Sequence, residues 1–206
     1  MRHNLVEKII AKGIKDKHVL KAIETIPRHL FMDSSFLEYA YEDKPFPIGS
    51  GQTISQPYTV AFQTELLNIK RGDKVLEVGT GSGYQACVLI EMGAKVYTVE
   101  RHKSLYMQSK KLLSELGYKP VLMSYGDGYK GLPVHAPFDK IIVTAGAPCV
   151  PADLKSQLKT GGCLVIPVGN EIQVMMRIIK TESGSFTEEK HGTFRFVPLL
   201  ENRATN

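Results

Sequence analysis

A chain of 206 residues, of which 43% are hydrophobic and 23% charged, has the size and composition of an ordinary globular protein. Its three cysteines form no Cys-x-x-Cys pair, which argues against a disulfide framework or a zinc site and for a reducing compartment, the cytoplasm. The net charge of +5 is dispersed, with Lys110-Lys111 as the only adjacent lysine pair, so we expect no nucleic-acid partner.

Residues 1–45 are expected to be helical, because apolar residues recur there at helical spacing. Two runs carry the pattern: Leu5, Val6, Ile9 and Ile10, and then Val19, Leu20, Ile23 and Ile26. Pro27 ends the second run. Charged residues interrupt the first 20 positions, and no segment approaches the ~18 apolar residues of a membrane span. We therefore expect neither a signal peptide nor a membrane partner.

Residues 45–57 are expected to form a long loop, because the segment is rich in proline and glycine. A loop of this length inside a compact domain is more often functional than idle. Pro57 suits the first position of a helix, which would continue to the turn at residues 71–73.

From residue 74 onward the pattern alternates between strand and helix. Strands are expected at 74–78, 95–99, 121–124, 139–144 and 163–168, and helices at 84–92, 103–116 and 152–158. This alternation predicts an α/β fold with a doubly wound, mostly parallel sheet. Two further strands, 172–180 and 193–197, joined through the polar segment 181–190, are expected to form an antiparallel edge.

The whole chain, 1–206, is thus expected to be a single domain. It divides into an N-terminal helical layer with an active-site loop (1–56), a cofactor-binding α/β core (57–170) and C-terminal edge strands (171–206).

The first strand leads into the glycine-rich turn Glu77-Val78-Gly79-Thr80-Gly81-Ser82-Gly83. A tight turn without a ligand would not require three glycines at alternate positions. A dinucleotide fingerprint requires Gly-x-Gly-x-x-Gly, and here Gly83 comes one residue early. Glu77 would also repel a pyrophosphate, whereas S-adenosylmethionine carries an ammonium and a sulfonium and no phosphate. The turn therefore predicts S-adenosylmethionine rather than NAD as the cofactor.

Two later acids also lie at or just beyond the ends of expected strands, where open α/β sheets bind their ligands. Glu100 ends the second strand, 23 residues after Glu77, and is expected to accept hydrogen bonds from the ribose hydroxyls. Asp127, followed by Gly128 in a slim loop after the third strand, is placed to meet the adenine amino group. Taken alone, Glu100 could be a solvated acid and Asp127 an ordinary turn residue.

The loop before Pro57 supplies hydroxyl and amide donors in Gln52-Thr53-Ile54-Ser55-Gln56. An amine acceptor of a methyl group needs a base, whereas a carboxylate, with a pKa near ~3.5–4, is already ionised. Such an acceptor needs orientation and exclusion of water, for which short donors suffice. The alternative is that Thr53 or Ser55 merely caps the helix that begins at Pro57.

These motifs resemble those of the protein-L-isoaspartate O-methyltransferases, over nearly the whole chain. The specific segments are Gly51–Tyr58, Gly79–Gln85, Gly126–Gly128, Leu158–Gly169 and Arg195–Leu199. The resemblance implies methylation of the α-carboxylate of L-isoaspartyl residues in damaged proteins and peptides, followed by closure to a succinimide that partly hydrolyses to aspartate. Two positions depart from the family pattern, Thr160 in place of proline and Cys163 in place of a basic residue, and neither belongs to the predicted site.

By the same resemblance Ser55 is the catalytic residue, whose hydroxyl holds the acceptor carboxylate. The predicted cofactor-binding residues are Thr53, Ile54, Glu77, Gly79, Gly81, Gly83, Glu100, Asp127 and Gly128. Residues 196–199 resemble the part that helps to close over the substrate. No metal site is predicted, and we expect a monomer.

Three other functions remain open on the residues alone. The first is a methyltransferase of the same fold that acts on a small molecule or a nucleic acid, against which the Gln52–Tyr58 loop argues. The second is a cofactor-binding scaffold without catalysis, which Ser55 and the intact turn oppose. The third is an NAD oxidoreductase, which Glu77 disfavours.

Overall fold

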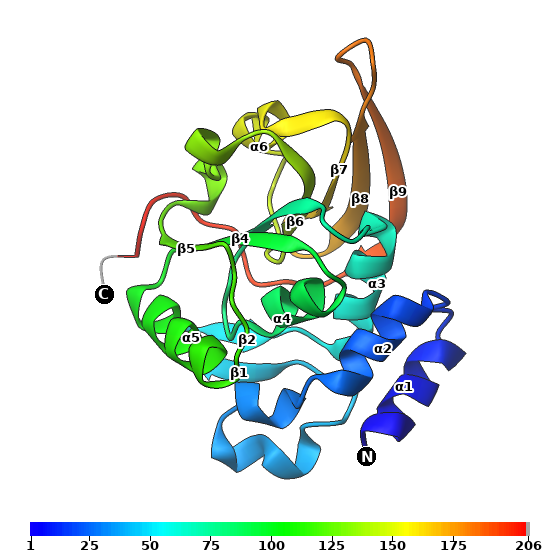
Figure 1. Ribbon diagram of the computed structural model, residues 1–206, viewed down its shortest axis with the longest axis vertical. Helices are drawn as coiled ribbons and strands as arrows, with labels where there is room; N and C mark the ends of the chain where they lie inside the picture. Colours follow the sequence, from blue (N-terminus) through cyan, green and yellow to red (C-terminus); the bar gives the residue numbers. More distant parts are fainter. Residues whose placement is uncertain (205–206) are drawn as a thin grey trace.

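A seven-stranded sheet forms the centre of the computed structural model, which describes residues 1–204 (Figure 1). Its strands are β3 (Lys74–Val78), β4 (Lys95–Glu100), β5 (Leu122–Tyr125), β6 (Phe138–Val143), β7 (Leu158–Val168), β8 (Gln173–Lys180) and β9 (Phe186–Phe194), in the order β5-β4-β3-β6-β7-β8-β9. The pairs from β5 to β7 are parallel, while β8 and β9 add two antiparallel pairings. The predicted fold class, with its antiparallel edge, is confirmed.

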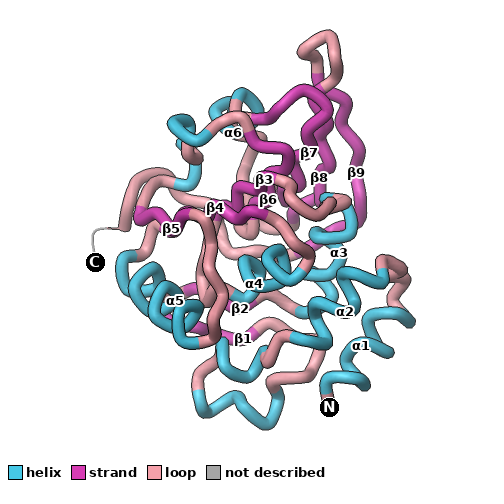
Figure 2. Tube along the Cα trace, in the orientation of Figure 1, coloured by secondary structure: helices cyan, strands magenta, loops and turns pink. Residues whose placement is uncertain are grey.

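Helices cover both faces of this sheet. They are α1 (Arg2–Ala11), α2 (Lys17–Thr25), α3 (Pro57–Leu67), α4 (Tyr84–Glu91), α5 (Lys103–Glu115) and α6 (Ala152–Ser156), with short 3₁₀ turns η1 (Arg28–Phe31), η2 (Ser34–Tyr39), η3 (Gly128–Lys130) and η4 (Pro133–His135). Helices α1 to α5 lie on one side and α6 on the other (Figure 2). The sheet has a hydrophobic core on each face, and alternate residues of β3 pack into different cores. Val75 packs in the core on the side of α1 to α5, and Leu76 packs in the core on the side of α6. Burial on both faces explains why the central strands are almost continuously apolar.

Most element boundaries lie within one or two residues of the prediction, and α3 begins at Pro57 as expected. The loop expected at residues 45–57 is partly wrong, because it contains a small antiparallel hairpin of β1 (Phe46–Gly49) and β2 (Gln52–Ile54). Ile54 is buried and pairs with Phe46 across this hairpin. Two prolines at residues 45 and 47 suggest a loop, yet proline is compatible with an edge strand.

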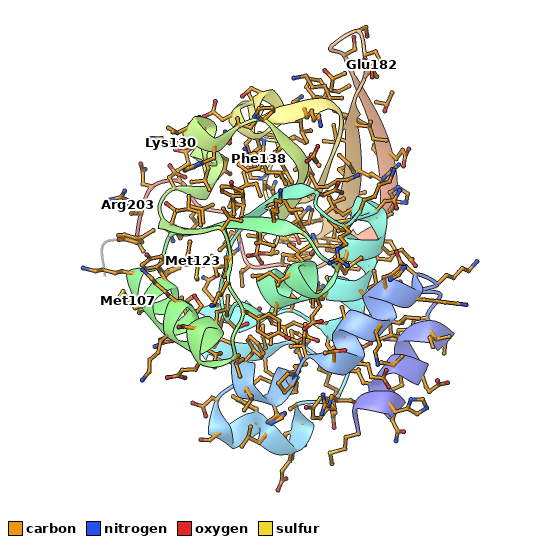
Figure 3. All side chains as sticks on the ribbon, viewed as in Figure 1. Met107, Met123, Lys130, Phe138, Glu182 and Arg203 are labelled. Atoms are coloured by element: carbon orange, nitrogen blue, oxygen red, sulfur yellow. The ribbon has the colours of Figure 1, made fainter. Side chains whose placement is uncertain are left out.

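The strand expected at residues 193–197 is wrong. Strand β9 runs from Phe186 to Phe194, and the polar connection shortens to a turn in which the Thr181 N–H donates to the Ser185 carbonyl. Glu182 lies at the tip of this hairpin (Figure 3). As the outermost strand, β9 exposes most of its side chains, so its polar sequence is typical of a protected edge rather than of a linker. Residues 195–199 leave the hairpin and cross to β6, where Pro198 bridges to Gly146.

Strand β7 begins at Leu158, five residues before the expected start at residue 163, and α6 ends at Ser156. The first part of β7 pairs with β6 through a shift of register between Phe138 and Lys140. No helix of the described residues is long and apolar enough to cross a membrane.

Candidate active site

The carboxyl ends of β3, β4 and β6 lie at one edge of the sheet. Gly79, Glu100 and Thr144 come together there. The Gly79 N–H donates to the Val99 carbonyl at 2.9 Å, and the Thr144 N–H donates to the Val78 carbonyl at 3.0 Å. Glu100 is the last residue of β4. The chain passes from β3 outward to β5 and then returns to β6 on the other side of β3, so this edge lies at the switch in strand order where open sheets bind ligands.

Two glycines of the turn at this edge have no room for a side chain. Gly79 has a φ of +96°, and a Cβ there would lie 2.6 Å from Thr144 Oγ1. Gly83 has a φ of +88°, and a Cβ there would lie 2.3 Å from Leu113 Cδ1 of α5. The two glycines therefore serve different purposes, since Gly79 opens the backbone toward the cleft and Gly83 lets α5 pack against the turn.

Glu100 is positioned to bind both the turn and a ligand. Its side chain is buried, Oε2 accepts the Gly81 N–H at 2.8 Å, and Oε1 accepts the His102 N–H at 2.8 Å. An ionised carboxylate has about four lone-pair sites, so each oxygen retains capacity to accept from a hydroxyl. Ribose hydroxyls are donors of this kind, and binding them stays the role predicted for Glu100.

Glu77 lies beneath the turn and is fully buried on the α4 side of the sheet. Oε2 accepts the Thr98 hydroxyl at 2.6 Å, and that hydroxyl also contacts the Thr80 hydroxyl at 2.6 Å. Oε1 has no hydrogen-bond partner among the described residues. Burial raises the pKa of Glu77 to about 8. The nearby Glu100 carboxylate also raises this pKa, whereas the hydrogen bond from Thr98 lowers it by a smaller amount than burial raises it. At neutral pH burial therefore favours the neutral acid, and the role of Glu77 beside a cationic ligand stays a prediction.

Asp127 accepts two backbone N–H groups. Oδ1 accepts from Tyr129 at 2.9 Å within η3, and Oδ2 accepts from Asn202 at 2.9 Å in the C-terminal tail. It lines a separate cavity with Arg203 at the β5 end of the sheet (Figure 3). In this structure Asp127 therefore holds the tail.

A donor cavity opens at the carboxyl edge between the turn, the β1–β2 hairpin and the tail. The predicted cofactor residues that line it are Thr53, Gly79, Gly81, Glu100 and Gly128, whereas Ile54, Glu77, Gly83 and Asp127 do not. A Cβ at Gly128 would lie 2.6 Å from Val78 Cγ1. Bare backbone beside a carboxylate with free lone pairs fits an adenosyl ligand, which needs close approach and hydroxyl acceptors.

An acceptor cavity of about 650 Å³ adjoins the donor cavity. Ser55 lines it together with Gln56 and Arg195, and the two cavities share Thr53, Thr144 and Val197 in their walls. A group bound in the acceptor cavity therefore meets the donor at a boundary formed by these three residues. This is the geometry that an in-line group transfer between two ligands requires.

The Ser55 hydroxyl makes no hydrogen bond with any of residues 1–204, and its residue is half-buried in the acceptor cavity wall. The alternative that Thr53 or Ser55 caps α3 finds no support here, since neither hydroxyl bonds to the helix. Ile54 lies between them in the core, so strand alternation directs Thr53 and Ser55 to the same side of the segment. A hydroxyl that is free and faces a cavity is available to a ligand.

Two further residues line both cavities: Thr144, which the sequence did not single out, and Val197, which lies in the segment 196–199 expected to close over the substrate. The Thr144 hydroxyl donates to the Gly79 carbonyl at 2.7 Å, which fixes the turn, and the Gly146 N–H donates to the Val197 carbonyl at 2.8 Å, which fixes the tail segment. The position of Thr144 as the last residue of the expected strand 139–144 was the only available signal, because nothing in a lone threonine indicates a site. No cluster of His, Cys, Asp or Glu suited to a metal occurs in the described part of the chain.

Replacing Glu100 with alanine should weaken binding of S-adenosylhomocysteine by about tenfold to hundredfold, because hydrogen bonds to a charged acceptor are lost. Calorimetric titration measures this change. Glu115→Ala, which removes an exposed acid at the end of α5, provides the control and should leave affinity unchanged. Unchanged affinity in Glu100→Ala would contradict the assignment of Glu100 to the donor cavity.

The chain is similar to known proteins over nearly its whole length. A family model described as protein-L-isoaspartate(D-aspartate) O-methyltransferase matches residues 1–204. A protein-L-isoaspartate O-methyltransferase of Christiangramia forsetii is 62% identical over 202 residues, covering 98% of this chain and 95% of the relative. That of Flavobacterium psychrophilum is 59% identical over 203 residues, with the same two coverages.

Solved structures are similar over the same length. A protein-L-isoaspartate O-methyltransferase superposes with a TM-score of 0.86 at 32% identity, covering 96% of this chain and 65% of the other. A protein from Plasmodium falciparum assigned to the same activity, in complex with S-adenosyl-L-homocysteine, superposes with a TM-score of 0.84 at 26% identity, covering 97% and 98%.

Proposed function

The chain belongs to the protein-L-isoaspartate(D-aspartate) O-methyltransferase family, and we propose that its two adjoining cavities hold the methyl donor and the isoaspartyl acceptor of that reaction. It transfers a methyl group from S-adenosylmethionine to the α-carboxylate of L-isoaspartyl residues in damaged proteins and peptides. The single observation that carries the assignment of the site is the free Ser55 hydroxyl in the acceptor cavity, next to the boundary with the donor cavity.

S-adenosylmethionine supplies the methyl group on a sulfonium, which leaves as a neutral thioether. Glu100 is proposed to hold the ribose hydroxyls, while Gly79, Gly81 and Gly128 give the donor access to the backbone. Thr144 keeps the turn in place through its bond to the Gly79 carbonyl. These residues bind and orient, and none of them needs to exchange a proton.

The acceptor carboxylate, with a pKa near ~3.5, is ionised at neutral pH, so no general base is required. The Ser55 hydroxyl is proposed to donate a hydrogen bond to one carboxylate oxygen, leaving the other oxygen to receive the methyl group. Thr53 and Val197 border both cavities and exclude water from the reacting atoms. Catalysis then rests on orientation and proximity.

The product explains why the reaction initiates repair. A methyl ester can expel methoxide, whereas a free carboxylate would have to expel oxide. The neighbouring backbone nitrogen therefore loses its proton and attacks the ester carbonyl, methanol leaves, and a succinimide forms without further help from the protein. Hydrolysis of the succinimide opens it partly to a normal aspartyl residue.

Incubation with S-adenosylmethionine and an isoaspartyl peptide tests the function directly. Mass spectrometry should show the gain of one methyl group on this peptide, and the matched peptide with a normal aspartyl residue should remain unmodified. A methyltransferase of the same fold that acts on RNA or a metabolite would instead leave both peptides unmodified and methylate its own substrate.

Three further properties of the chain are proposals. We propose that it acts as a monomer, which light scattering during turnover would test, and that it works in a reducing compartment. Cys87 and Cys163 are buried and free, as is usual for cytoplasmic proteins. We also propose that nucleic acid is not a partner, because the excess positive charge is dispersed along the sequence.

A further inference from the structure

Helix α3 begins without a cap from its own sequence. Pro57 is its first residue, and the side chain of Gln56 before it forms no capping bond. The first N–H groups of a helix have no partners within the helix and need acceptors from outside. The Tyr58 N–H finds one in a distant segment, since it donates to Asp43 Oδ1 at 2.7 Å. Asp43 therefore takes the position that a capping serine or aspartate usually occupies.

The second oxygen of Asp43 binds the other side of the same segment. Oδ2 accepts the Gln56 side-chain amide at 3.0 Å and forms an ion pair with Lys12 at the end of α1. The Asp43 side chain is only 7% exposed, and the Lys12 ammonium also lies 5.2 Å from the centre of the Tyr58 ring. One carboxylate thus joins the N-terminal helical layer to Gln56 and Tyr58, which follow Ser55 closely in the chain.

A buried arginine supports the chain next to Asp43. Arg28 is fully buried, donates from Nη2 to the Lys44 carbonyl at 3.2 Å, and lies 5.1 Å from the centre of the Tyr84 ring. Tyr84 is the first residue of α4, directly after the glycine turn. The bond from buried Arg28 to Lys44 therefore anchors the chain next to Asp43 to the core, in addition to the contact of Asp43 with Lys12 at the surface.

We propose that Asp43 is a positioning residue for methyl transfer, which caps α3 from outside so that the Ser55 hydroxyl stays free for the acceptor. This inference rests on the proposed function of Ser55. Serine is itself a favoured capping residue, and a Ser55 hydroxyl that accepted a helix N–H would be turned toward the helix and away from the acceptor. By satisfying the Tyr58 N–H and holding Gln56, Asp43 removes this cause of reorientation and fixes the segment that carries Ser55.

Kinetics of Asp43→Ala with an isoaspartyl peptide should show a fall in kcat on the order of tenfold to hundredfold, as displacement of a reacting group produces. Affinity for S-adenosylhomocysteine, measured by calorimetry, should stay within about twofold, because Asp43 does not line the donor cavity. Asp43→Asn keeps an oxygen that can accept from Tyr58 and should recover part of the rate. It also serves as the informative variant if the alanine variant does not fold.

Asp16→Ala is the matched control, because Asp16 caps α2 through the His18 and Val19 N–H groups and lies outside both cavities. It should lower thermal stability to a similar degree while leaving kcat unchanged. Equal losses of kcat in Asp16→Ala and Asp43→Ala would overturn the proposal, since the effect would then be one of general stability.

The double variant Asp43→Ala/Ser55→Ala tests whether Asp43 acts through Ser55. If it does, removing Asp43 should change the residual rate of Ser55→Ala by less than about twofold. Multiplying effects would overturn the proposal, as would wild-type kinetics in Asp43→Ala. Failure of the proposed function is recognised separately, because the wild-type chain would then not methylate the isoaspartyl peptide at all.

Discussion

Replacing Ser55 with alanine is expected to lower kcat for an isoaspartyl peptide by on the order of tenfold to a thousandfold, as removal of an orienting hydrogen bond does. The hydroxyl is free of bonds to the described chain and lies in the acceptor cavity, so its loss removes a contact to the acceptor without disturbing the fold. Donor affinity should remain nearly intact. Steady-state kinetics and calorimetric titration with S-adenosylhomocysteine measure the two quantities.

Two variants control this result. Ser183→Ala removes a hydroxyl in the β8–β9 turn, away from both cavities, and should leave both quantities unchanged. Glu100→Ala should show the opposite pattern, with donor affinity as the main loss. If Ser55→Ala and Glu100→Ala lose donor affinity alike, the division of roles between the two cavities is wrong.

Replacing Glu77 with glutamine is expected to raise the free energy of unfolding relative to that of the wild type as the pH increases. The gain between pH 4.5 and pH 8 should be on the order of 5 kcal/mol. The pKa of Glu77 is raised from 4.5 to about 8 by burial, so in this window the folded chain keeps a proton that the unfolded chain releases. The free energy of unfolding of the wild-type chain therefore loses a contribution of about 1.4 kcal/mol for each pH unit. Glutamine does not titrate, so the variant escapes this loss.

Urea unfolding at pH 5 and at pH 8 measures the effect as the difference between variant and wild type. The variant should gain stability relative to the wild type as the pH rises, with most of the gain complete near pH 8. Glu188→Gln on the exposed face of β9 is the control, and its difference should be flat. A flat difference for Glu77→Gln as well would show that Glu77 is ionised in the folded chain.

The sequence predicted those parts of the fold that depend on local pattern. Strand β3 and the start of α3 at Pro57 follow from a short apolar run and from the preference of proline for the first turn of a helix. Strand β9 and the β1–β2 hairpin were missed for the same physical reason, because both lie at edges. An edge strand buries little, so its sequence is polar or rich in proline and does not show the alternation that identifies inner strands.

The placement of Glu100 and Gly79 at the carboxyl edge of the sheet was predictable, because strand ends determine it. Contacts were not predictable where a distant segment supplies the partner. Asp127 binds the Asn202 N–H, 75 residues later, and Asp43 binds Tyr58 across 15 residues. No spacing rule connects such pairs, because only the tertiary fold brings them together. Glu77 shows a further limit, since the residue was noticed but its protonation depends on burial that a sequence pattern does not give.

The three residues common to both cavities have a consequence for how the protein can change. Thr53, Thr144 and Val197 each line both cavities. If the cavities hold the donor and the acceptor as proposed, a substitution at any of these residues should alter both affinities at once, so natural variation or engineering could not adjust the two independently there. Broadening the range of peptides accepted, without a penalty in donor binding, must therefore begin at residues that border only the acceptor cavity, such as Arg195.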